Sequence, residues 1–162
     1  MPGFVIHLAV ANEYIRKHQN EIKQKEDFLK GVIAPDFTTD KSKTHYAKDS
    51  INTNLKLYLE SNIVNTDYEK GFFLHLITDC IFYQKYFKNL TTSLYNDYDV
   101  LNKTIIEKYN VKVLKEIEPY AKYKQGEPQI LKEDKIYKFI EEVSNLKLEE
   151  VKLKVENNES II

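Results

Sequence analysis

The chain has 162 residues, the length of one domain, and 42% of them are hydrophobic, which is enough for one core. Its 24 basic and 25 acidic residues nearly cancel, which excludes a general electrostatic attraction to nucleic acid or to anionic membranes. The single cysteine, Cys80, excludes an intrachain disulfide and a cysteine-based zinc site. A metal would therefore have to be held by histidines and carboxylates.

The N-terminus lacks the basic region of a signal peptide, and no run approaches the roughly 18 apolar residues of a membrane span. We therefore expect a cytoplasmic protein without a transmembrane segment. With 4 Gly and 4 Pro, the chain also lacks the frequent turn signals of an all-β fold. Apolar residues instead recur at helical spacing. They predict an all-α, single-domain bundle of about six or seven helices. The buried metal site that we expect within it follows from the histidines and aspartates described below.

The first predicted helix begins at Phe4, where apolar residues follow a spacing of three and four. A short second helix is expected to end near Lys30, with Gly31 as its stop. Residues 32–49 read as a loop, because Pro35 disfavours a helical conformation in the residue before it and the Thr, Asp and Ser cluster favours turns.

Later helices are predicted from capping residues and amphipathic spacing. A third helix, capped by Asp49 or Ser50, would run through Glu60, and a fourth, capped by Thr66 or Asp67, would cover residues 68–88. Others are expected over 92–109, 111–123 and 132–146, with a break over 124–131. Residues 1–147 would form the helical metal-binding domain. Residues 148–162 would form a charged C-terminal tail, as a short strand, a helical extension or a disordered segment.

The most specific local motif is HLITD in the predicted fourth helix. His75 and Asp79 are four residues apart and therefore lie one turn apart on the same side of the helix. An imidazole and a carboxylate so placed can reach one cation. The surrounding sequence is strongly apolar, and a buried carboxylate is unfavourable unless it is paired or binds a metal. The competing interpretation is a His–Asp hydrogen bond within the core.

Three further candidates precede this motif. His7 lies on the apolar face of the first helix, Asp36 follows Ala34-Pro35, and His45 lies at the end of the polar loop. Taken singly, they have ordinary explanations: a core histidine, a turn aspartate and a solvated histidine. Taken as a set, three of the 4 histidines lie where a carboxylate can accompany them. His18, near the polar end of the first helix, is left out.

The ordered set of His7, the Pro-Asp of GVIAPD, the histidine of THY and the HLITD motif resembles the zinc-dependent phospholipase C family. Its superfamily includes the fungal single-strand-specific nucleases. The match covers roughly the first half of the chain. The resemblance implies that Asp36, His45, His75 and Asp79 surround one metal. It also implies that Asp79 bridges to a second metal, for which His7 is a ligand.

Two departures from the family pattern reduce the expected number of ions. The family uses an N-terminal tryptophan on its second metal, and this chain has no tryptophan. Its third metal requires two later histidines, but no histidine follows His75 here. The expectation is therefore one or two divalent ions. Zinc is favoured, but fewer histidines and more carboxylates would also suit manganese or iron.

The predicted fifth helix offers further oxygen ligands. Asp99 and Asn102, three residues apart, could share a face and complete a metal shell, with Asp97 close by. Asp99 is therefore included among the candidate metal ligands. The alternative interpretation is a solvated helix start, because acidic residues favour first turns.

The resemblance implies metal-dependent hydrolysis of a phosphoester, in the manner of a phospholipase C or another phosphodiesterase, with phosphomonoesterase activity also to be assayed. Asp36 and Asp79 are the candidate catalytic residues because either could orient the attacking water. The expected substrate is a small-molecule phosphoester or a phospholipid head group, and no nucleic acid is expected. Lys41 and Lys43 precede His45 and are either phosphate ligands or simply solvated.

Two other functional classes remain open. An HD-type phosphohydrolase is also all-helical and uses histidines and aspartates on metal, but its adjacent His-Asp doublet is absent from this sequence. Alternatively, the chain is a non-enzymatic helical domain with a structural metal or a buried polar network. A metal assay would separate this interpretation from the enzymatic ones.

Overall fold

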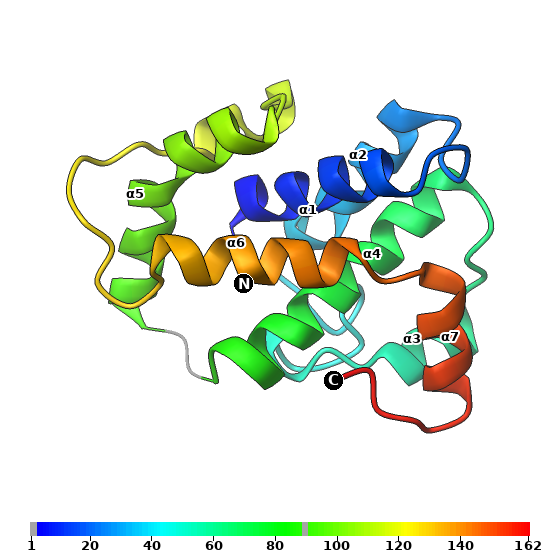
Figure 1. Ribbon diagram of the computed structural model, residues 1–162. Coiled ribbons are helices and arrows are strands. Elements are labelled where there is room, and N and C mark those ends of the chain that lie inside the picture. Colours follow the sequence, from blue (N-terminus) through cyan, green and yellow to red (C-terminus); the bar gives the residue numbers. More distant parts are fainter. Residues whose placement is uncertain (1–2, 89–90) are drawn as a thin grey trace.

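Two helices, α1 (Phe4–Lys17) and α4 (Asp67–Ile81), lie at the centre of the fold. The computed structural model describes residues 3–88 and 91–162 (Figure 1). Within these ranges the regular secondary structure is entirely helical, and the helices pack into one domain around one hydrophobic core. The all-α prediction is confirmed. In the same ranges no helix has both the length and the apolar character needed to cross a bilayer.

The remaining helices surround this pair. In Figure 1, α6 (Glu133–Ser144) crosses the face of the molecule, α5 (Thr92–Tyr109) lies near its first turn, and α7 (Leu148–Glu156) packs with α3 (Leu55–Ser61) beyond its last turn. α7 covers much of the segment for which three alternatives were left open. It is helical and buries Leu148, Val151 and Val155 in the common core.

α2 (Lys25–Ile33) packs closely against α4 through two glycines. A Cβ atom on Gly31 would lie 2.0 Å from the carbonyl oxygen of Tyr68, and one on Gly71 would lie 2.0 Å from that of Phe28. Gly31 therefore serves close approach between helices, and its prediction as a helix stop was wrong. Because α2 continues past it, Ile33 and its neighbours reach α4 in helical conformation.

The segment after α2 also differs from the predicted loop. Ala34–Phe37 form the 3-10 helix η1, with Pro35 in its first turn, where the missing N–H of proline is tolerated. Ala34 itself has helical angles (φ −58°, ψ −41°), so the expected effect of Pro35 on it is not observed. This short helix places Asp36 next to the centre of the molecule.

The predicted third and fourth helices exist, but each is shorter than expected. Asp49 caps only the 3-10 turn η2 (Ser50–Asn52), and Asn54 caps α3. α4 begins with a capping box in which Thr66 and Glu69 bond each other's backbone N–H groups, and it ends at Ile81. A π-helical turn, η3 (Phe82–Tyr86), follows.

The helix predicted over 111–123 is wrong. Only a 3-10 segment, η4 (Lys115–Tyr120), forms there, and Pro119 lies inside it. The chain then runs alongside α5, where the Asn102 side-chain amide donates to the Lys122 carbonyl and the Lys124 N–H donates to the Asp99 carbonyl. Contacts with α5 thus replace the expected intrahelical hydrogen bonds.

Candidate metal centre

The His75–Asp79 pair of α4 is fully buried. One helical turn brings Nε2 of His75 to 3.3 Å from Oδ2 of Asp79. On its other side, Nδ1 of His75 lies 2.6 Å from the carbonyl oxygen of Val32, which can only accept, so Nδ1 is the donor. The close packing of α2 on α4 supplies this carbonyl. The hydrogen bond fixes the ring and directs Nε2 toward Asp79.

Two more imidazoles contact the Asp79 carboxylate. His45, fully buried, places Nε2 2.8 Å from Oδ2, while its Nδ1 lies 2.8 Å from the hydroxyl of Thr44. His7, from α1, places Nε2 3.2 Å from Oδ1. Its ring stacks on that of His75, with centroids 3.7 Å apart. Asp79 is therefore at the centre of three histidines that come from two helices and a loop.

Asp36 faces the same group from η1. Its Oδ2 lies 3.5 Å from Nε2 of His75, and its Oδ1 lies 3.6 Å from Nε2 of His45. The ammonium group of Lys41 lies 2.8 Å from Oδ1, and its side chain is 19% exposed. Lys41 thus connects the buried centre to the surface.

Ligand atoms from four residues converge in the manner of a metal site. Atoms of Asp36, His45, His75 and Asp79 all lie within 4.8 Å of one another. Donors about 2.0–2.2 Å from a tetrahedral ion are separated by roughly 3.3–3.6 Å, close to the separations found here. The buried group could therefore bind a divalent metal.

Several buried atoms of this centre lack a hydrogen bond within the described part of the chain. They are both ring nitrogens of His7, Nε2 of His75, Oδ2 of Asp36 and Oδ1 of Asp79. Buried polar atoms are otherwise almost always satisfied. An ion at this point would engage His75 Nε2 and the two carboxylate oxygens, so the donor set fits a divalent cation.

The buried charges shift the ionisation of the centre. Burial, with the positive charge of His75 nearby, lowers the pKa of His7 to about 4, so this imidazole is neutral at neutral pH. Burial also opposes charge on His75, but the carboxylates of Asp36 and Asp79 outweigh it and raise its pKa to about 10. Burial likewise opposes charge on Asp79, but the surrounding histidines hold its pKa well below the usual range. Without a metal, a protonated His75 compensates the carboxylates.

The predicted site residues thus lie together with one exception. His7, Asp36, His45, His75 and Asp79 share one centre, whereas Asp99 lies elsewhere, in the lining of a pocket. Asp99 shares a face with Asn102, as its spacing predicted, but that face is turned to the pocket. His18, which was left out, contacts the Ser144 carbonyl at 2.9 Å.

Three contacts around the centre were not predicted. The Val32 carbonyl, the Thr44 hydroxyl and the Lys41–Asp36 ion pair all orient or charge-balance ligand residues. Thr44 and Lys41 are in the right loop, but nothing in their spacing distinguishes them from solvated residues. A backbone carbonyl such as that of Val32 leaves no signal in the residue type.

Comparison of the chain with models of protein families, with curated proteins and with solved structures finds no match. The interpretation of the centre therefore depends on its own residues and geometry.

Proposed function

We propose that this protein is a metal-dependent hydrolase of a small phosphoester. The observation that carries the proposal is the convergence of the Asp36, His45, His75 and Asp79 ligand atoms, with unsatisfied atoms among them. When bound, a divalent ion supplies hydroxide at neutral pH by acidifying water. Zinc is the ion we favour, with manganese or iron as alternatives. The choice of a phosphoester follows the resemblance to the phospholipase C family.

The side chains of the centre would bind the ion, orient the attacking water and bind the phosphate. Asp79, which all three histidines contact, would anchor the ion. Asp36 would orient the attacking water, because it lies beside the surface-reaching Lys41. An ammonium group has three donors, so Lys41 can bind a phosphate oxygen while it retains Asp36. We assign His7, 3.2 Å from the free Oδ1 of Asp79, to a second ion.

A specific observation also favours a structural metal. The side chains of His7, Asp36, His45, His75 and Asp79 are each 0% exposed. Structural metal sites are closed, whereas catalytic ones keep an open position for water or substrate. A metal that only stabilises the helices is therefore the second candidate function.

The decisive experiment combines metal analysis with turnover. Purified protein would be stripped with a chelator and reloaded with zinc, manganese or iron(II). Its activity would be measured on p-nitrophenyl phosphate and on bis(p-nitrophenyl) phosphate. We expect a stoichiometric metal, together with turnover that the Asp36→Asn variant loses. Metal without turnover would favour the structural alternative, and absence of metal would exclude both.

A matched control is available within the chain. His18 is the remaining histidine and lies outside the centre, against the Ser144 carbonyl. The His18→Asn variant should retain metal and turnover, whereas the His75→Asn variant should lose both. Circular dichroism would confirm that each variant is folded. If both variants behaved alike, the assignment of His75 would be wrong.

A further inference from the structure

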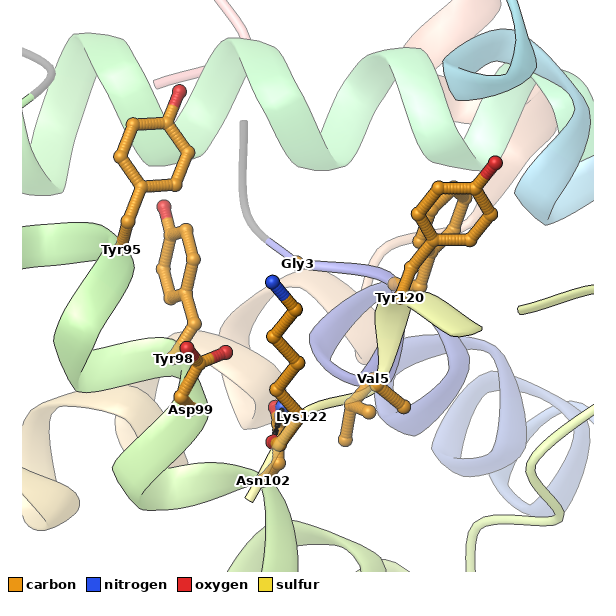
Figure 2. A pocket seen from close by; sticks show the side chains of 10 residues that line it. Gly3, Val5, Tyr95, Tyr98, Asp99, Asn102, Tyr120 and Lys122 are labelled. Atoms are coloured by element: carbon orange, nitrogen blue, oxygen red, sulfur yellow. Dashed lines mark hydrogen bonds between the residues drawn. The ribbon is translucent and has the colours of Figure 1, made fainter. Parts of the chain in front are cut away.

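A pocket of about 280 Å³ lies at the start of α1, the helix that carries His7 (Figure 2). It is formed by α5, the start of α1, and the end of η4 with the segment that follows it. Phe4, which lines it, is three residues before His7 on α1, and its ring packs on Phe37, the residue after Asp36. The pocket is slightly smaller than the range for small-molecule sites, which begins at about 300 Å³. Its place and size suit one part of a small substrate.

Two hydrogen-bond acceptors lie next to each other on one wall of the pocket. Asp99 and Asn102 are one turn apart on α5, and both line the pocket. The side-chain N–H of Asn102 is committed to the Lys122 carbonyl at 2.8 Å, which fixes the orientation of the amide. Its oxygen, Oδ1, is buried and has no hydrogen-bond partner within residues 3–88 and 91–162. A ligand that fits this wall must offer two neighbouring donors.

The other walls are largely aromatic. The rings of Phe4, Tyr95, Tyr98 and Tyr120 border the pocket, and the ammonium group of Lys122 points between them in Figure 2. The Tyr98 hydroxyl is buried and, in the described part of the chain, unsatisfied. It can donate to a ligand or accept from one. The Lys122 ammonium balances the Asp99 carboxylate, so the pocket has no net negative charge that would favour a cationic ligand such as a quaternary ammonium group.

A polyol meets all of these requirements. Vicinal hydroxyls donate to two adjacent acceptors, and their own oxygens accept from an ammonium or a phenol. The C–H faces of a saturated ring pack on aromatic side chains. We infer that this pocket binds the alcohol part of the phosphoester, and that this alcohol is a polyol whose vicinal hydroxyls bond Asp99 and Asn102. Its role in turnover rests on the proposed function, but polyol binding itself needs no metal.

The binding test uses the metal-free full chain and myo-inositol, a rigid ring of vicinal hydroxyls. Amide signals would be followed by NMR during titration, with cyclohexanol and choline as comparison ligands. We expect saturable shifts with myo-inositol at residues 95–102 and 120–122, and weaker binding of both comparison ligands. No saturable shift with myo-inositol, or equal binding of cyclohexanol or choline, would overturn the inference.

Two variants and one control test the contacts. Asp99→Ala should weaken myo-inositol binding about tenfold, and Tyr98→Phe about three- to tenfold, as expected for loss of one or two hydrogen bonds. Tyr98→Phe should stay folded, because its hydroxyl has no partner to lose within the described residues. Tyr109 also has a buried, unsatisfied hydroxyl but does not line the pocket, so Tyr109→Phe should bind normally. If Tyr98→Phe bound like Tyr109→Phe, the Tyr98 contact would be refuted.

Turnover separates this inference from the proposed function. With metal-loaded protein, we expect kcat/KM at least tenfold higher for myo-inositol 1-phosphate than for cyclohexyl phosphate. Equal values would refute the polyol subsite and leave the hydrolase proposal standing. Binding of myo-inositol without turnover of either ester would refute the hydrolase proposal and still support the pocket assignment.

Discussion

Two buried aspartates show how the same residue type can serve different purposes. Asp79 and Asp97 are both 0% exposed. The oxygens of Asp97 accept from the backbone N–H groups of Gln129, Ile130 and Leu131 at 2.7–2.8 Å. Asp79 instead faces three imidazoles, and its Oδ1 lacks a hydrogen bond in the described part of the chain.

The partners of a buried carboxylate indicate its role. The backbone amides around Asp97 cannot change their protonation state, so they make a permanent anchor for the 124–131 segment. The imidazoles around Asp79 can lose a proton and bind a metal instead. We therefore expect Asp97 to govern stability without metal and Asp79 to govern the response to metal.

The largest expected effect is stabilisation by metal. Zinc at a free concentration of a thousand times its Kd should raise the free energy of unfolding of the wild type by about 4 kcal/mol. Asp79→Asn should gain nothing, because its amide cannot replace the central carboxylate. Denaturant unfolding with zinc and with chelator measures this difference. An equal gain in stability on adding zinc to the wild type and to Asp79→Asn would show that Asp79 does not govern the response to metal.

Removing the Asp97 carboxylate should lower the stability of the protein even in the absence of metal. Asp97→Ala should lower the free energy of unfolding in chelator by about 3 kcal/mol, because it leaves three backbone N–H groups without their charged acceptor. The gain on adding zinc should be retained. The same pair of unfolding titrations measures both quantities. If zinc no longer raised the free energy of unfolding of Asp97→Ala, Asp97 would have to contribute to the metal centre.

Metal affinity should rise with pH between 6.5 and 8. In the folded, metal-free protein the pKa of His75 is raised from 6.5 to about 10, so its imidazole carries a proton that the metal must displace. Release of one proton corresponds to about a tenfold change in affinity per pH unit. Isothermal titration in two buffers of different ionisation enthalpy would count the proton. A pH-independent affinity would contradict protonation of His75.

The raised pKa of His75 also determines how the stability of the metal-free protein depends on pH. The folded pKa of His75 lies above its unfolded value, so its contribution is fully present below pH 6.5 and is lost as pH rises through about 10. The free energy of unfolding in chelator should therefore fall across this window in the wild type. In His75→Asn the slope over the same window should be smaller. Equal slopes would exclude His75 as the group responsible.

The smallest expected effect is that of Asp79→Asn without metal. Its free energy of unfolding in chelator should change by about 1 kcal/mol or less, because the lost pairing with His75 is offset by relief of the cost of burying two charges. Asp97→Ala in the same buffer serves as the comparison. A loss for Asp79→Asn as large as that for Asp97→Ala would show that the centre is a structural network.

The sequence signals that succeeded are local ones. Thr66, one of the two predicted caps, does begin α4, and the spacing of His75 and Asp79 places both on one side of that helix, because each signal depends only on helix geometry. The all-helical class follows from apolar periodicity in the same way. The grouping of His7 with these residues depended on their order in the chain and on the resemblance.

The signals that failed depend on contacts distant in sequence. Gly31 has the residue type of a helix stop but is required by the approach of the Tyr68 backbone. Residues 111–123 have helical spacing, but Pro119 and the bonds to α5 favour an extended path. Asp97 lies in the segment whose alternative interpretation was a solvated helix start, but it is buried and its partners lie 32–34 residues later.

The most direct test of the central claim is the metal content of the wild type and of Asp79→Asn. Native mass spectrometry after reloading with zinc would count the ions on each folded chain, with His18→Asn as the control. We expect at least one ion on the wild type and on His18→Asn, and none on Asp79→Asn. No ion on the wild type, or an unchanged count on Asp79→Asn, would contradict a metal centre at Asp79.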